Sequence, residues 1–221
     1  YKKWRYKLHS NTKKNIFAVG EYWAPGEVNL LQKYIDTTEG SMSLFDSSLQ
    51  QNFHIASKEG ANYDLRKIFD ETLTLLNPTH SVTVVDNHDT QPLQDLEAPV
   101  EKWFKPLAYA LILLRENGYP CVFYPDLFGA NYTDKDKEGN EQEIFLDKVE
   151  KIDELLKARQ EFAYGFQRDY FDDANSLGWT REGNDDHSGC AVVLSNKDAG
   201  EKNMEMGKKY AGSFFYDYLG W

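Results

Sequence analysis

The sequence predicts an α/β fold followed by a shorter region of antiparallel β structure. Four apolar runs rich in β-branched and aromatic residues lie at residues 15–21, 42–46, 81–87 and 120–126. Each run is short, mostly continuous and bounded by turn residues, which is typical of strands buried on both faces. Helical patterns separate the runs. Because strands that alternate with helices form βα units, we expect the four strands to be parallel.

Four segments have the apolar spacing of helices: residues 25–38, 63–76, 99–117 and 143–162. The third begins at a proline and ends before Gly118, which are the expected start and stop signals. We expect Pro106 to kink this helix, because proline lacks the backbone N–H. In the fourth segment four apolar residues share one helical face. They are Phe145, Val149, Ile152 and Leu156.

Four βα units make half of a closed (β/α)₈ barrel, which needs about 250 residues. From residue 167 the pattern changes to short β-like runs separated by Gly, Asn and Asp, at residues 169–171, 177–181, 190–195 and 213–218. Such runs predict an antiparallel β domain. We therefore expect two domains, a half-barrel at 1–166 and the incomplete start of a β-sandwich at 167–221.

The charge balance narrows the choice of partners. The chain has 25 basic and 36 acidic residues, a net charge of −11. An acidic surface repels phosphate backbones and anionic lipid, so we expect neither nucleic acid nor a membrane as partner. Cys121 and Cys190 are the only cysteines and have no metal-binding spacing. Their scarcity favours a reducing compartment, hence the cytoplasm, with secretion as the alternative.

Acidic residues end the four predicted strands or follow them closely: Glu21, Asp46, Asp89 and Asp126. In a βα barrel the active site lies at the carboxyl ends of the strands. Carboxylates converging there, with Tyr22 and Trp23 alongside, suit sugar chemistry, because acidic pairs transfer protons across a glycosidic bond and aromatic faces pack on sugar rings. The alternative is structural, since acids at these positions also cap the following helix.

Two motifs are far more specific. Residues 85–90 (VDNHDT) and 19–23 (VGEYW) resemble conserved motifs of the α-amylase family, glycoside hydrolase family thirteen. Residues 103–110 (WFKPLAYA), 115–120 (RENGYP), 122–124 (VFY) and 178–183 (GWTREG) extend the resemblance to the liquefying Bacillus-type and enterobacterial cytoplasmic α-amylases. The tripeptide at 124–126 (YPD) is more similar to the cytoplasmic group. The resemblance runs almost from end to end.

The resemblance implies a role for each of these residues. Glu21, at the end of barrel strand five, corresponds to the general acid/base, and Asp89, after strand seven, to the acid that stabilises the oxocarbenium-like transition state. His88 corresponds to a histidine that hydrogen-bonds the sugar. Trp23 and Gln91 are expected substrate contacts. Residues 1–166 would then supply barrel strands five to eight.

One family feature is missing from the sequence. The nucleophilic Asp lies in an Arg-x-Asp-x-x-Lys-His-type motif, which does not occur here, and residues 1–4 (YKKW) resemble the helix that follows it. A retaining glycosidase needs a second carboxylate about 5–5.5 Å from the acid. The resemblance implies endo-hydrolysis of α-1,4-glucosidic bonds in starch, glycogen and maltooligosaccharides by double displacement, but we expect this chain alone to be inactive.

Two other functions remain open, a maltooligosaccharide-forming amylase of the same family and a non-catalytic glucan-binding fragment. The expected partner is an α-glucan. The uncovered strands also predict a non-native dimer, or pairing with the absent N-terminal half, because parallel sheet edges carry unpaired N–H and C=O groups.

The resemblance implies no metal site in this chain. The family's principal calcium site uses upstream residues, so Ca²⁺ is expected only through those residues in a full-length enzyme. At a second calcium site of the Bacillus enzymes, Asn175 and Asn196 stand where carboxylates are expected, and Ala174 replaces a histidine. Amides are weaker Ca²⁺ ligands than carboxylates, so this site is predicted to be lost.

Overall fold

A four-stranded parallel sheet forms the centre of the molecule in the computed structural model, which describes residues 2–14 and 16–220. Its strands are β1 (Val19–Gly20), β2 (Ser43–Phe45), β3 (Ser81–Val84) and β4 (Tyr119–Cys121), and they lie side by side in chain order. The register aligns Gly20 with Leu44 and Leu44 with Ser81. All four strands fall within the predicted runs or one residue outside them, and the α/β fold is confirmed.

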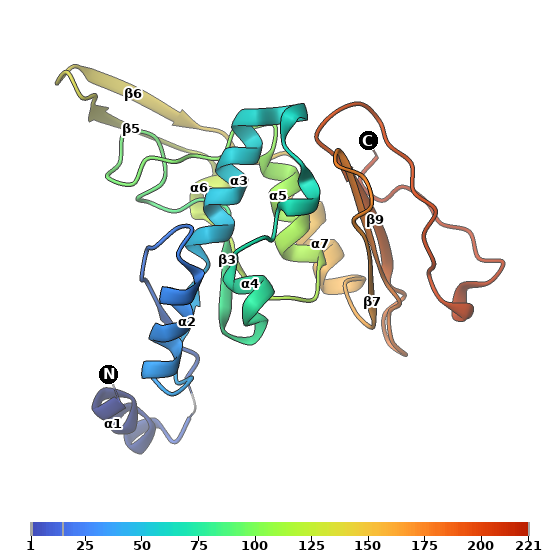
Figure 1. Cartoon of the computed structure of the whole chain (residues 1–221), viewed down its shortest axis with the longest axis horizontal. Coiled ribbons are helices and arrows are strands. Elements are labelled where there is room, and N and C mark those ends of the chain that lie inside the picture. The colour runs from blue at the N-terminus through green and yellow to red at the C-terminus, as the bar shows by residue number, and fades with distance from the viewer. Residues whose placement is uncertain (1, 15, 221) are drawn as a thin grey trace.

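Seven helices accompany the strands within the described residues (Figure 1): α1 (Lys2–Thr12), α2 (Val28–Thr37), α3 (Ser47–Glu59), α4 (Leu73–Leu76), α5 (Lys105–Leu114), α6 (Tyr124–Phe128) and α7 (Ile152–Glu161). Short 3₁₀ turns lie at Gly60–Asn62, Leu65–Lys67, Pro78–His80 and Lys208–Tyr210. None of the described helices is both long and apolar enough to cross a membrane.

The predicted helix at 63–76 is wrong, and helix α3 was not predicted. Asp46 caps α3 by accepting a hydrogen bond from the Leu49 N–H (3.1 Å), and Gly60 ends it with a φ of +57°. The segment after it instead forms a 3₁₀ turn and the four-residue helix α4, whose cap is Thr72. Both stretches bury apolar residues at helical spacing, so the local pattern did not separate one from the other.

Helix α5 begins later than predicted and is not kinked by its proline. It starts at Lys105, so Pro106 lies in its first turn, where the missing N–H has no helical partner to lose. Eight of its ten residues are buried, and it runs through the main apolar core. The proline therefore starts the helix.

The predicted helix at 143–162 is only half correct. Its first part is strand β6 (Glu141–Leu146), which pairs antiparallel with β5 (Ala130–Lys135) in a hairpin that projects from the body (Figure 1). Phe145 is exposed on this strand rather than on a helical face. The turn is fixed by Asp136, which accepts hydrogen bonds from the Glu138 and Asn140 N–H groups. Helix α7 occupies only the second part.

Besides the β5–β6 hairpin there is a second antiparallel sheet, of three strands: β7 (Gln167–Tyr170), β8 (Ser176–Arg181) and β9 (Cys190–Ser195). These strands confirm three of the four predicted runs, whereas residues 213–218 form no strand. Leu177, Trp179 and Leu194 of this sheet belong to the same apolar core as α5 and α7.

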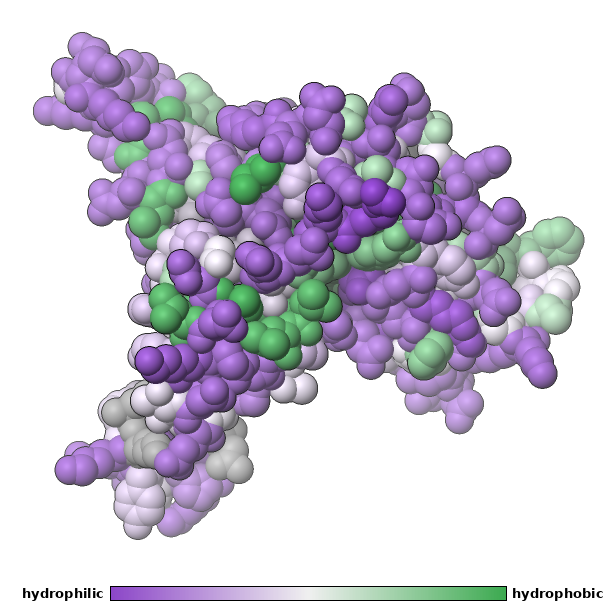
Figure 2. All heavy atoms as spheres, viewed as in Figure 1, coloured by the Kyte–Doolittle hydropathy of each residue, from purple (hydrophilic) through white to green (hydrophobic). Residues whose placement is uncertain are grey.

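The face of the molecule shown in Figure 2 is largely hydrophilic, as expected from the charge of the chain.

Arg115, directly after α5, binds this second sheet to the rest of the molecule. Its guanidinium donates two hydrogen bonds to Asp169 on β7, of 2.6 and 2.8 Å. It also lies over three aromatic rings, those of Phe69, Phe171 and Trp179, at 4.8, 4.9 and 5.6 Å. A planar cation is needed for this arrangement, because a lysine ammonium cannot make the paired bonds.

Arg115→Lys is expected to lower the free energy of unfolding by about 1.5–3 kcal/mol, because it removes paired charged hydrogen bonds and weakens the cation–π contacts. Urea unfolding followed by tryptophan fluorescence measures this. Arg66→Lys is the matched control, since Arg66 makes the same paired bonds to Asp64 at the exposed surface. Equal losses in the two variants would contradict the role given to the buried guanidinium.

Candidate functional site

The carboxyl ends of the parallel strands all lie at the same end of the central sheet, which we call the rim. Glu21 directly follows β1 and Asp46 directly follows β2. Residues 85–91 follow β3, and α6 lies just beyond β4. Because the strands are parallel, these segments all emerge on the same side, which is where open and closed α/β sheets bind ligands.

Glu21 is exposed, and its carboxylate makes no hydrogen bond or ion pair with any described residue. The segment after it is held in place, because the Ala24 N–H donates to the Ser47 hydroxyl (3.1 Å) and the Tyr22 ring stacks on Tyr34 (5.4 Å between centroids). Trp23 is half-buried between these anchors. The oxygens of Glu21 are therefore open to a ligand while the backbone beneath them is fixed.

His88 and Asp89 lie together in the turn after β3. The His88 Nε2 is 3.4 Å from an Asp89 carboxylate oxygen, and the side chains are 72% and 36% exposed. The Asn87 side-chain oxygen accepts hydrogen bonds from the N–H groups of Asp89 (2.9 Å) and Thr90 (2.8 Å), which fixes the turn. Gln91 is half-buried in the same turn, and its N–H donates to the Asn87 carbonyl.

The structure thus brings His88, Asp89 and Gln91 into one turn and places Glu21 and Trp23 at the end of another strand. β2 lies between these two strands. With strands about 4.8 Å apart, the two groups leave the sheet roughly 10 Å from each other. The two groups therefore lie on the same side of the sheet, separated by the width of β2.

Asp46 has a structural role, which was the alternative given for the strand-end acids. It is buried, caps α3, and accepts two hydrogen bonds of 2.7 Å from the N–H and hydroxyl of Thr74. Burial raises its pKa, which these hydrogen bonds oppose. Its oxygens are occupied, so Asp46 is not open to a ligand at the rim.

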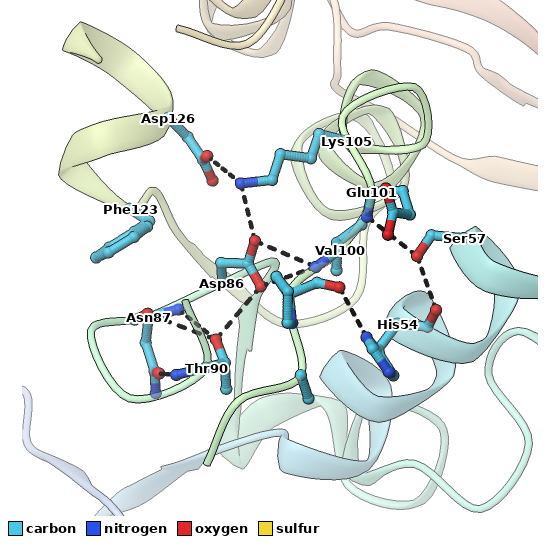
Figure 3. A network of polar contacts seen from close by, with 12 residues as sticks. His54, Ser57, Asp86, Asn87, Thr90, Val100, Glu101, Lys105, Phe123 and Asp126 are labelled. Carbon is cyan, nitrogen blue, oxygen red and sulfur yellow. Dashed lines mark hydrogen bonds and ion pairs between the residues drawn. The ribbon is translucent and has the colours of Figure 1, made fainter. Parts of the chain in front are cut away.

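A buried charge network lies beneath the turn after β3 (Figure 3). The Lys105 ammonium is 2.8 Å from an Asp86 oxygen and 2.5 Å from an Asp126 oxygen. The Tyr109 hydroxyl donates to the other Asp126 oxygen (2.7 Å). Burial lowers the pKa of Lys105, but the two carboxylates outweigh burial and the net pKa is raised. Lys105 is therefore a protonated cation shared by two acids.

Sequence reasoning did not identify Lys105 and Asp86 as a functional pair. The available signal was a lone charged residue at the start of an otherwise apolar helical segment, residues 105–114. A lysine there needs a partner, since burying an unpaired charge costs several kcal/mol. Nothing local indicates that its partners lie 19 residues before it and 21 residues after it.

Asn175 and Asn196 form an amide bridge between the antiparallel sheet and the loop after α3. The Asn196 side-chain N–H₂ donates to the carbonyls of Gly60 (2.8 Å) and Tyr63 (2.9 Å). The Asn175 N–H₂ donates to the Ala61 carbonyl (2.8 Å) and the Asn196 side-chain oxygen (2.9 Å). Amide N–H groups thus occupy the backbone carbonyls that a cation would need as ligands. This arrangement of side chains does not fit calcium.

The fold and the rim define an α/β protein with an exposed acid, and with an exposed histidine beside a partly exposed aspartate, at the carboxyl ends of parallel strands. None of the known protein-family models matches the chain. The chain is 52% identical over 220 residues to the cytoplasmic α-amylase of Escherichia coli (strain K12), which covers all of this chain and 44% of that protein. It is 46% identical over 219 residues to an α-amylase of Geobacillus stearothermophilus, covering 98% of this chain and 38% of that protein.

A third relative is the glucan 1,4-α-maltohexaosidase of Bacillus sp. (strain 707), which is 45% identical over 98% of this chain and 40% of its own length. Among solved structures, a cyclomaltodextrin glucanotransferase, CldA, matches with a TM-score of 0.58 and 20% identity, covering 81% of this chain and 38% of that one. At this identity the match shows the fold alone.

These similarities confirm the resemblance to the α-amylase family. The chain is similar throughout to the C-terminal part of bacterial α-amylases and spans about two fifths of the length of these relatives.

Ca²⁺ is expected to leave the melting temperature of the 221-residue chain unchanged, because the amide bridge offers donors where a cation needs oxygens. A site with a Kd one hundredth of the Ca²⁺ concentration would add about 2.7 kcal/mol. Thermal melts in millimolar Ca²⁺ and in chelator give the melting temperatures of the chain with and without the ion. A large upward shift would reveal a calcium site elsewhere in the chain.

The amide bridge itself is expected to stabilise the fold. Asn196→Asp turns a double donor into an acceptor that faces two carbonyls, which should cost about 1–3 kcal/mol, or about 2–10 °C in melting temperature. Asn131→Asp makes the same charge change at an exposed site on β5 and serves as the control. A melt of Asn196→Asp that matches this control would show that the bridge contributes nothing.

Proposed function

We propose that this chain is the C-terminal half of the catalytic (β/α)₈ barrel, strands five to eight, of an enzyme that hydrolyses α-1,4-glucosidic bonds. Residues 1–166 would form the half-barrel and residues 167–221 the start of a β-sandwich domain. The observation that carries the proposal is that Glu21 and His88, both exposed, share one rim with the partly exposed Asp89, in a chain similar throughout to α-amylases.

The curvature of the sheet supports the half-barrel. β1 and β4 are the outer strands, and in a flat sheet they would be about 14 Å apart, three spacings of about 4.8 Å. Nevertheless the rings of Phe17, just before β1, and Tyr119, on β4, are 5.0 Å apart. The sheet therefore bends so that side chains from its two edges meet on the concave side, as the interior of a barrel requires.

In the proposed mechanism Glu21 protonates the leaving glycosidic oxygen and later deprotonates the attacking water. Its open position at the rim supports this role. Asp89 holds the sugar hydroxyls and stabilises the positive charge that develops in the transition state, and His88 beside it hydrogen-bonds the same sugar. Trp23 and Gln91 would contact the glucan on either side.

A retaining double displacement also needs a nucleophilic carboxylate about 5–5.5 Å from Glu21. Asp46 and Asp86 are buried with their oxygens hydrogen-bonded or ion-paired, and Asp89 leaves the sheet two strands away. We therefore assign the nucleophile to a preceding part of a longer protein. Calcium, where the complete enzyme uses it, would likewise be bound by preceding residues.

The relative named glucan 1,4-α-maltohexaosidase favours a second candidate, the release of maltooligosaccharides of defined length. The name of the E. coli relative supports a cytoplasmic location, and secretion is the alternative. We further propose an α-glucan as partner, and neither nucleic acid nor membrane.

Glu21→Gln is expected to lower turnover of starch by about 10²–10⁴-fold, because the amide cannot donate the proton. The test uses a hybrid enzyme in which residues 1–221 replace the matching C-terminal part of the E. coli cytoplasmic α-amylase. Maltooligosaccharide binding should persist. Glu138→Gln, in the exposed β5–β6 turn, is the control. Near wild-type turnover of Glu21→Gln would show that the acid/base is another residue.

The 221-residue chain alone is expected to show no hydrolysis and to associate with itself. We expect apolar side chains on and beside the parallel strands to face the barrel interior that the absent strands would cover. Of these, Phe17 and Val19 are exposed, Phe123 is half-buried, and Val82 and Val84 are buried. The outer strands β1 and β4 also have an unpaired edge each, which favours pairing with another chain. Size-exclusion chromatography tests the self-association, and a starch assay on the same sample tests the absence of hydrolysis.

The complementary experiment adds the N-terminal part of the E. coli relative in trans, which should restore both monodisperse behaviour and hydrolysis. A monomer of 1–221 that hydrolyses starch unaided would contradict the assignment of the nucleophile to a preceding segment.

A further inference from the structure

We propose that Lys105 is a positioning residue for the reaction, and that it fixes the turn carrying His88 and Asp89 by acting through Asp86. The inference rests on the proposed function, since it assigns Lys105 to the same site. Lys105 itself does not reach the rim, because its side chain is only 13% exposed and its ammonium is engaged by two carboxylates.

Lys105 joins its own helix to two other segments (Figure 3). Lys105 starts α5, Asp86 lies two residues beyond β3, and Asp126 lies on α6 beyond β4. Asp126 is held in turn by the Tyr109 hydroxyl, and its carbonyl accepts the Val149 N–H (2.8 Å). The ammonium is thus anchored on one side by the packed helices and holds Asp86 on the other.

From Asp86 a series of hydrogen bonds continues into the turn after β3. Asp86 accepts hydrogen bonds from the Val100 N–H (3.2 Å) and the Thr90 hydroxyl (3.3 Å). The Thr90 oxygen also accepts the Asn87 N–H (2.9 Å). Asn87 in turn binds the Asp89 N–H, so four consecutive contacts join the ammonium to the backbone of the candidate catalytic acid.

The Lys105 ammonium also neutralises two carboxylates that are buried close together. Asp86 and Asp126 are 2% and 1% exposed, so solvent does not screen them from each other. Without the ammonium, the two carboxylates must separate or one must take up a proton. Either change alters the carboxylate that holds Thr90 and Val100, and a shift of about 1 Å at a catalytic group costs on the order of 100-fold in rate.

The test compares variants in the hybrid enzyme defined above. Lys105→Met is expected to lower kcat by about 10–100-fold with KM within about threefold, because the misplaced Asp89 weakens the transition state more than ground-state binding. Thr90→Val keeps the charge network and removes only the link to the turn, and should lower kcat by about threefold to tenfold. Lys102→Met breaks an exposed ion pair to Asp147 and is the matched control.

Amide hydrogen exchange gives a readout that does not depend on activity. Both Lys105→Met and Thr90→Val should accelerate exchange at residues 87–90, while exchange in β7–β9 stays unchanged. Should Lys105→Met fail to fold, Thr90→Val alone decides the question.

The outcomes separate the inference from the function on which it rests. A folded wild-type hybrid without hydrolysis overturns the proposed function. An active wild-type hybrid whose Lys105→Met and Thr90→Val variants keep kcat within about twofold overturns the positioning role and leaves the function intact. Loss of activity that accompanies faster exchange throughout the molecule, with Thr90→Val unaffected, also overturns it, because Lys105 would then be merely structural.

Discussion

The Lys105 ammonium, shared between Asp86 and Asp126, is the interaction on which the part of the rim after β3 and β4 depends. It joins the start of α5 to the segments that follow β3 and β4, and through Asp126 it reaches Val149, just before α7. The hydrogen bonds between parallel strands stop where the strands end, so the loops at their carboxyl ends need separate anchors. A buried cation between two anions supplies one, because removing it leaves unpaired charge in a dry interior.

Arg115 does similar work at the other end of α5. It binds the antiparallel sheet through Asp169 and three aromatic rings, so one apolar helix carries a buried cation at each end. Both cations have acidic partners, in a chain with an excess of 11 acidic residues. The apolar body of α5 fills the core, and its charged ends determine which surrounding segments pack against it. The apolar residues of α5 thus place the helix in the core, whereas Lys105 and Arg115 determine how the neighbouring segments are arranged around it.

The sequence predicted the parallel strands and α2 well, because continuous apolar runs and a strong helical period are local signals. It failed where the outcome depended on distant contacts. Phe145 has helical spacing with Val149, yet the turn at Asp136 and Gly139 returns the chain as a hairpin. Glu21, His88 and Asp89 were identified as candidate site residues from sequence motifs. The Lys105 network did not, since each partner lies about 20 residues away and only the fold brings them together.

The rim also shows why strand-end acids could not be sorted by sequence alone. Glu21 and Asp89 have the same chemistry as Asp46, Asp86 and Asp126, and all follow parallel strands. What separates them is desolvation. The three buried acids have their oxygens filled by Thr74, Thr90, Lys105 and Tyr109. A carboxylate that must attack carbon or transfer a proton needs a free lone pair within reach of the substrate. Of these five acids only Glu21 and Asp89 meet that condition, and β2 lies between the strands that they follow. The double displacement proposed above, which needs a second carboxylate about 5–5.5 Å from Glu21, would therefore take its nucleophile from a preceding segment.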